Sequence, residues 1–286
     1  MFYDFQTVTH GKWILAGEHA VIRGHGALVF PIHDKTLTLS YQKPVSGLMG
    51  LVINTDYLDS PGNDILLLIT KVLKRAVSLV DQPYSRLQGT LHLSSNIPAG
   101  VGMGASAALC VAIARWFTAE RLITTQQIHD FARELEHLFH GQSSGLDIAG
   151  VSSLSGAYFK QGHSSPITQA WNPNWQLSSC GDIGATSDCI NQVQRLWEQD
   201  LTHATMLDQQ MNDSVDQARQ ALEKHTPQSL PLLIDAMNKA NDCFLQWGLI
   251  TPALQHHMQQ LRDQGALAVK PTGSGGGGIV VCLWPK

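Results

Sequence analysis

Apolar and polar residues alternate with two different periods along this chain, and the two periods predict both strands and helices. In the first half, short β-branched or alternating runs predict strands at 12–16, 36–41 and 90–94. Apolar residues three and four positions apart predict helices at 63–80, 105–121 and 125–139. Thr124 and Thr125 precede the last of these and can cap its N-terminus.

The second half has a mostly helical pattern followed by two short apolar runs. Helices are predicted at 188–224, 228–247 and 252–264, and strands at 266–270 and 279–283. Between the halves, residues 161–175 are rich in Gly, Ser and Pro and predict a linker or a long connection. We therefore expect an α+β protein in two parts, with domains at 1–165 and 166–286.

Composition limits the kind of partner. The 286 residues are 43% hydrophobic and 15% charged, which is typical of a globular protein with a sizeable core. A formal net charge of −4 gives no electrostatic reason to expect nucleic acid or an anionic membrane surface as a partner. An anionic ligand would have to be held by local groups, such as backbone N–H donors and a few lysines.

The cysteines and the first residues of the chain indicate the cellular compartment in which the protein works. Five cysteines, an odd number with no C-x-x-C spacing, disfavour a disulfide framework or a thiolate zinc site and fit a reducing compartment. The first six residues lack the basic start and apolar stretch of a signal peptide. No run of about 18 apolar residues occurs. Together these features predict a cytoplasmic protein.

A glycine-containing loop at 94–108 joins a predicted strand to an Ala-rich helix. Glycines lack Cβ, so Gly100, Gly102 and Gly104 allow the backbone to curl tightly against a ligand. The helix N-terminus offers unpaired N–H groups and the positive end of its dipole, which favour an anion. Ser106 could add a hydroxyl to phosphate or Mg²⁺. A purely structural turn into a packed helix is the alternative.

This loop differs from the two best-known phosphate loops. The P-loop needs a lysine after its last glycine, and none follows here. The dinucleotide fingerprint needs G-x-G-x-x-G and an acid at the end of the next strand, whereas Glu120 falls inside a predicted helix. A Rossmann oxidoreductase is therefore only weakly supported.

Two further segments place glycines beside groups that can do chemistry. Lys12 starts a predicted strand that is followed by Gly17, Glu18 and His19, and side chains often converge on a site at strand ends. A solvated lysine and a loop acid are equally open readings. The four glycines at 275–278 indicate a backbone that must pass close to something, because an apolar strand follows at once and disfavours a flexible linker.

A fourth segment, 134–147, predicts a helix that ends at Gly141 and a Ser/Gly loop that presents Asp147. His137 and His140 lie three residues apart and could suggest a metal site. Without a third nearby ligand of the usual kind, structural or surface histidines are the favoured interpretation. Periodicity alone leaves Glu136 ambiguous.

These four segments, in this order, resemble the GHMP kinases, named after the galacto-, homoserine, mevalonate and phosphomevalonate kinases. The resemblance extends from Gly11 to Leu283, and the Gly-Glu-His-Ala-Val and His-Gly-Gln-Ser-Ser-Gly-Leu-Asp segments are most similar to the mevalonate kinases. It implies an N-terminal domain like a ribosomal-protein domain, a ferredoxin-like C-terminal domain, and transfer of a phosphoryl group from MgATP to a mevalonate-like alcohol. It also implies that homodimers are common.

The resemblance also implies roles for individual residues. Asp147 would act beside the substrate hydroxyl, with Lys12 favouring its ionised form and stabilising the developing alkoxide. Ser106 and Glu136 would hold Mg²⁺. Glu18, His19 and Thr272 would face the substrate. The residues implied to wrap the triphosphate are Gly100, Val101, Gly102, Met103, Gly104, Ala105 and Ser106.

The chain departs from the family pattern at a few positions. Ala105 replaces the first serine of the usual Gly-x-Gly-Ser-Ser, which removes one hydroxyl. Ser143 replaces proline in the loop that bears Asp147, which predicts a less rigid loop. His10 and Ile148 replace a usual proline and asparagine. None of these changes removes a group that phosphoryl transfer requires.

Two alternatives remain open at this point. One is another kinase of the superfamily, for phosphomevalonate or a sugar; a phosphorylated acceptor would call for basic residues, for which Arg23, Lys35 and Lys160 are the candidates. The other is a catalytically silent nucleotide-binding protein on the same fold, which the changes at Ala105 and Ser143 suggest.

Overall fold

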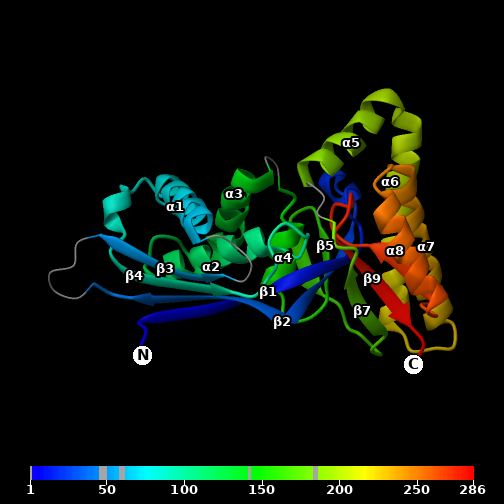
Figure 1. Cartoon of the computed structure of the whole chain (residues 1–286), viewed down its shortest axis with the longest axis horizontal. Helices are drawn as coiled ribbons and strands as arrows, with labels where there is room; N and C mark the ends of the chain where they lie inside the picture. The colour runs from blue at the N-terminus through cyan, green and yellow to red at the C-terminus, as the bar shows by residue number, and fades with distance from the viewer. Residues whose placement is uncertain (1, 45–49, 58–61, 141–142, 183–185) are drawn as a thin grey trace. The chain divides into compact units, whose positions relative to one another are not determined.

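The computed structural model describes residues 2–44, 50–57, 62–140, 143–182 and 186–286, and these form two compact units (Figure 1). The first unit comprises Met1–Lys12, Pro31–Ala99 and Met103–Ser152. The second comprises Trp13–Phe30, Gly100–Gly102 and Ser153–Lys286. Each unit is thus assembled from several chain segments. The predicted division into domains at 1–165 and 166–286 stays a prediction.

The first unit is a sheet covered by helices (Figure 1). Strand β3 is parallel to β4, and β4 is antiparallel to the second half of β2, with Leu39 opposite Leu93. Alternate residues of β4 are buried and face a core that the Ala-rich helix α2 completes with ten buried residues. The elements that lie wholly or partly in this unit are β1 (Phe5–Ala16), β2 (Ala27–Gln42), β3 (Leu51–Tyr57), α1 (Gly62–Leu79), β4 (Gly89–Ser95), α2 (Ala105–Ala119), α3 (Ile128–His140) and α4 (Leu146–Ser152).

The second unit contains a three-stranded antiparallel sheet in the order β7-β9-β8, packed against helices (Figure 1). In the same unit, the first residues of β2 pair antiparallel with β5, and β5 pairs antiparallel with β6; these strands belong to the sheet that contains β3 and β4. The elements are β5 (Ala157–Lys160), β6 (His163–Pro166), β7 (Asn174–Ser179), α5 (Thr186–Gln199), α6 (Leu201–Glu223), α7 (Ser229–Gln246), α8 (Pro252–Asp263), β8 (Ala268–Pro271) and β9 (Ile279–Trp284).

Most predicted elements are confirmed, and so is the α+β class. Every predicted strand overlaps an observed one, and Thr124 begins a capping box in which the Gln127 side chain accepts from its N–H at 2.8 Å. The predicted helix 188–224 is two helices, because Asp200 ends α5 and caps α6 by accepting from the N–H of His203. The connection predicted at 161–175 contains β6, and Gly141 lies outside the described residues.

All five cysteines are free thiols, as expected. Burial raises the pKa of the Cys243 thiol to about 12 and that of Cys282 to about 11, and it also raises the pKa of Cys110 and Cys189. Cys180 is half-buried. Over the part of the chain that the structure describes, no helix has the length and apolar character needed to cross a membrane.

Candidate active site

Lys12 and Asp147 form an ion pair in the first unit. Lys12 Nζ lies 2.9 Å from Asp147 Oδ1; the lysine side chain is 2% exposed and the aspartate 29%. Lys12 is on β1, and its N–H donates to the carbonyl of Met103 at 2.9 Å. Asp147 lies in the first turn of α4, where a negative charge suits the helix dipole. A buried cation beside a solvent-accessible carboxylate is thus held by two rigid elements.

Gly104 allows the loop before α2 to pass directly over the stem of Lys12. Its φ of 81° is one that glycine adopts readily. A Cβ at this position would lie 2.8 Å from Lys12 Cγ and 3.0 Å from Val151 Cγ1. Any side chain here would displace the lysine. Ala105 and Ser106 follow in the first turn of α2.

Glu136 adds a second carboxylate to this unit, on α3. It is 1% exposed, and Ser143 donates its hydroxyl to Glu136 Oε2 at 2.5 Å. Burial, and then the negative charge of Asp147, raise the pKa of Glu136 to about 8, although Lys12 and the Ser143 hydroxyl act in the opposite direction. Glu136 Oε1 is buried and has no hydrogen-bond partner among the described residues.

The side chain of His137 lies near an acid of the same helix. His137 Nδ1 is 3.7 Å from Glu134 Oε2, and both side chains are partly exposed. Across the described residues, no group of three or more His, Cys, Asp or Glu side chains is arranged to hold a metal ion.

In the second unit, the backbones of two glycine segments run side by side. A Cβ on Gly273 would lie 3.6 Å from the carbonyl oxygen of Gly102, and one on Gly278 would lie 3.2 Å from that of Val101. All of residues 275–278 have positive φ. The Gly273 distance is an ordinary contact, whereas a side chain at Gly278 would press on the Val101 carbonyl, and the positive φ values at Gly273 and at residues 275–278 favour glycine there.

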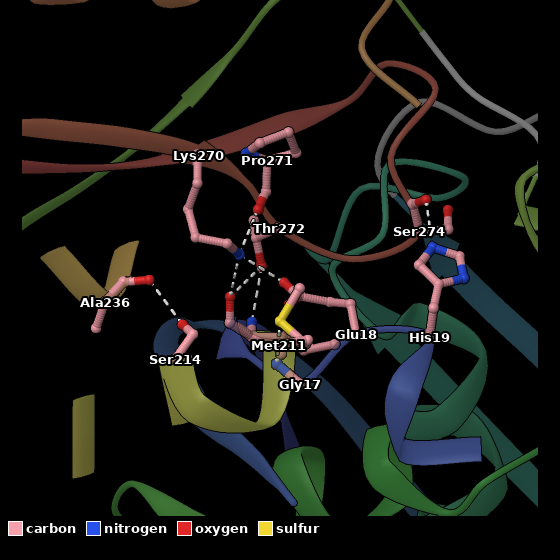
Figure 2. Close-up of polar contacts among 11 residues, drawn as sticks. Gly17, Glu18, His19, Met211, Ser214, Ala236, Lys270, Pro271, Thr272 and Ser274 are labelled. Carbon is pink, nitrogen blue, oxygen red and sulfur yellow. Dashed lines mark hydrogen bonds and ion pairs between the residues drawn. The ribbon is translucent and has the colours of Figure 1, made fainter. Parts of the chain in front are cut away.

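A buried ion pair joins Glu18 to Lys270 in the same unit (Figure 2). Lys270 Nζ lies 2.7 Å from Glu18 Oε1, and the side chains are 0% and 2% exposed. Lys270 Nζ also donates to the carbonyls of Pro271 at 2.5 Å and Ile14 at 3.5 Å, so three acceptors surround the ammonium. Burial lowers the pKa of Lys270, and Glu18 opposes that shift.

Thr272 links β1 to the glycine-rich segment 272–278 (Figure 2). Its hydroxyl oxygen accepts from the N–H of Ile14 at 2.7 Å and donates to the carbonyl of the same residue at 2.9 Å. The predicted substrate-facing roles of Thr272 and Glu18 stay predictions. In this structure their polar groups are engaged by Ile14 and Lys270.

His19 caps a short 3-10 helix (η1, Ala20–Arg23) in a backbone conformation with φ 59°. Its Nε2 lies 2.9 Å from the carbonyl oxygen of Ser274 and must donate, because a carbonyl only accepts (Figure 2). Burial lowers the pKa of His19 from 6.5 to about 4; Arg23 lowers it further and Asp208 raises it. The ring is therefore neutral at pH 7, with the proton on Nε2.

The lowered pKa of His19 predicts that the folded protein loses stability in acid. The unfolded chain gains a proton near pH 6.5 while the folded chain does so only near pH 4, so stability falls as the pH is lowered through this window. We expect His19 to contribute a loss of about 2 kcal/mol in the free energy of unfolding between pH 7 and pH 5. Urea unfolding of wild type and His19→Gln at pH 7 and at pH 5 measures this loss in the free energy of unfolding. Equal losses in the two proteins would contradict the assignment.

The segment 17–26, which bears Glu18 and His19, is held by one face of α6. The N–H of Gly17 contacts Met211 Sδ at 3.2 Å, and that of Gly26 donates to Asn212 Oδ1 at 3.3 Å. Arg23 makes a bidentate pair with buried Asp208, with Nε and Nη2 at 2.5 and 2.7 Å from its carboxylate oxygens. Arg23 is thus committed to a structural ion pair.

The predicted site residues form two groups within the units. Lys12, Glu136 and Asp147 interact in the first unit, which also holds Ser106. In the second unit, Glu18 and His19 contact residues of the segment 270–278, which contains Thr272. Sequence reasoning missed Lys270 as the partner of Glu18. A lysine inside an otherwise apolar strand was the available signal, because such a charge is rarely buried without a partner.

Comparison with known proteins supports the resemblance that the motifs indicated. Residues 69–156 match the family model described as the GHMP kinases N terminal domain. Over these residues the chain therefore has a domain of this kinase type, which implies ATP as the phosphoryl donor.

Curated relatives that match almost the whole chain are mevalonate kinases. The protein of Aeropyrum pernix is 27% identical over 290 residues, covering 96% of this chain and 87% of its own length. That of Thermococcus sibiricus is 26% identical over 299 residues with the same coverage. The crystal structure of L. major mevalonate kinase in complex with R-mevalonate has a TM-score of 0.80 at 26% identity, covering 99% of this chain and 87% of that one.

Proposed function

We propose that this protein transfers the γ-phosphoryl group of ATP to the primary alcohol of mevalonate and forms 5-phosphomevalonate. The observation that supports the proposal most directly is the Lys12–Asp147 ion pair, in which the Lys12 side chain lies against Gly104, the residue before α2. Relatives that match almost the whole chain are mevalonate kinases, which supports the choice of acceptor.

In the proposed mechanism, Asp147 accepts a hydrogen bond or the proton from the acceptor hydroxyl. The Lys12 ammonium, paired with the Asp147 carboxylate, stabilises negative charge that develops on the attacking oxygen. Backbone N–H groups at the start of α2, together with the Gly100–Ser106 segment, bind the phosphates. Little covalent work falls to the protein in phosphoryl transfer, so positioning and charge stabilisation account for most of the rate. The predicted contacts of Glu18, His19 and Thr272 with the substrate belong to the same proposal.

The residues present fit a Mg²⁺ ion. Glu136 Oε1 is a buried carboxylate oxygen without a partner in the described part of the chain, and Ser106 offers a hydroxyl in the first turn of α2. Mg²⁺ usually takes one or two protein oxygens together with substrate phosphates and water, so a larger acidic cluster is not required. We propose that Ser106 and Glu136 hold the ion, which would neutralise phosphate charge during transfer.

The rival acceptor, phosphomevalonate, finds less support. Of the three basic residues that the sequence offered for a second phosphate, Arg23 is paired with Asp208, Lys160 is exposed and Lys35 is half-buried on β2. The predicted homodimer and the cytoplasmic location remain part of the proposal; size-exclusion chromatography with light scattering would test the dimer.

The deciding experiment is an ADP-release assay coupled to NADH oxidation, with MgATP and each of mevalonate, phosphomevalonate, homoserine and galactose. We expect turnover with mevalonate and at most background rates with the others. Turnover only with another alcohol would refute the substrate assignment. ATP binding without turnover on any of the four would favour the catalytically silent alternative.

A further inference from the structure

Ser143 connects the carboxylate of Glu136 to the loop that carries Asp147. Its hydroxyl donates to Glu136 Oε2 at 2.5 Å, and its oxygen accepts from the N–H of Gly145 at 3.1 Å. Gly145 lies two residues before Asp147, where α4 begins. A single side chain thus joins α3 to the start of α4 through two hydrogen bonds.

The two oxygens of the Glu136 carboxylate differ as a result. Oε2 receives the only proton that the Ser143 hydroxyl can donate. Oε1 is buried and finds no donor among the described residues. Buried polar atoms are nearly always satisfied, so a lone unsatisfied carboxylate oxygen is a reason to expect a ligand that completes it.

The identity of residue 143 makes this arrangement particular to the chain. The family pattern described above has proline here, which carries no hydroxyl and cannot donate to a carboxylate. The Ser143 hydroxyl binds Glu136 and the N–H of Gly145. The lower rigidity expected of this loop stays a prediction.

We propose that Ser143 is a positioning residue that fixes the Glu136 carboxylate by binding Oε2, so that Oε1 stays available to a divalent cation. The inference rests on the proposed function, since that reaction requires the cation. Hydrogen-bonding partners of metal ligands typically change metal affinity 10- to 100-fold when they are removed.

The test measures Mn²⁺ binding by electron paramagnetic resonance in the presence of a non-hydrolysable ATP analogue, so that no acceptor alcohol is needed. We expect Ser143→Ala to weaken Mn²⁺ affinity about 10-fold or more and Ser143→Thr to restore it, because threonine keeps the hydroxyl. Ser144→Ala is the matched loop control: the Ser144 hydroxyl accepts from Leu146 N–H at 3.2 Å and has no hydrogen bond to Glu136 in the described part of the chain, so Mn²⁺ affinity should stay within about twofold of wild type.

A double-variant comparison separates positioning from a general effect on folding. If Ser143 acts through Glu136, Ser143→Ala should weaken Mn²⁺ binding much less in a Glu136→Gln background than in wild type. Wild-type Mn²⁺ affinity in Ser143→Ala, or an equal loss in Ser144→Ala, would overturn the inference. Mn²⁺ binding without turnover on mevalonate would refute the proposed substrate and leave the role of Ser143 intact.

Discussion

Asp147→Asn is expected to lower kcat for mevalonate by about 10²–10⁴-fold, the usual contribution of a general base. The amide keeps the size of the side chain but cannot take a proton or carry the charge that pairs with Lys12 at 2.9 Å. ATP binding should change little, because Asp147 is placed beside the acceptor alcohol in the proposed mechanism. Steady-state kinetics with mevalonate, together with the dissociation constant of an ATP analogue, give both quantities.

Asp235→Asn provides the matched control, since Asp235 is an exposed residue of α7. It should keep kcat within about twofold of wild type, as surface changes usually do. Near-wild-type kcat in Asp147→Asn would remove Asp147 from the mechanism. Loss of ATP binding in the same variant would instead assign the aspartate to the nucleotide.

Lys270→Met should destabilise the fold by about 3–5 kcal/mol, because it leaves the buried carboxylate of Glu18 without its cation. Methionine fills a similar volume and is apolar, so cavity formation adds little. Chemical denaturation at pH 7, followed by circular dichroism, measures the change. Lys71→Met, at an exposed position of α1, is the control and should shift the free energy by less than about 0.5 kcal/mol.

Removing both charges distinguishes the ion pair from simple loss of packing. In Lys270→Met with Glu18→Gln, the carboxylate is replaced by a neutral amide, so the double variant should be more stable than Lys270→Met alone. Strictly additive losses would show that the two side chains act independently, against the 2.7 Å contact between them.

The fold could be predicted where periodicity was strong. The helices α1, α2 and α3 and the strands β1, β2 and β4 follow from their apolar spacing. Strand β3 was missed because its residues alternate between exposed and half-buried, without a fully buried face. The short strand β6 is exposed at all four residues, so no hydrophobic pattern could reveal it. The break at Asp200 was hidden because helical spacing continues on both sides.

Of the candidate site, only the residues that belong to the sequence motifs could be predicted. The pairing of Lys12 with Asp147 follows from the family pattern, and the geometry agrees with it. Two interactions could not be found from residue spacing. The Lys270–Glu18 pair joins residues 252 positions apart in the sequence. The Ser143–Glu136 hydrogen bond depends on a serine that stands in place of the usual proline. Both became visible only when the contacts and the burial of each side chain were known.

The state of the thiols has a practical consequence for spectroscopy. A thiol reacts as its thiolate, and burial suppresses both the ionisation and the access of four of the five cysteines. Cys180, half-buried just after β7, is left as the natural attachment point for a maleimide dye or spin label. A reporter for motion in the second unit can therefore be introduced into the wild-type sequence without first removing any cysteine.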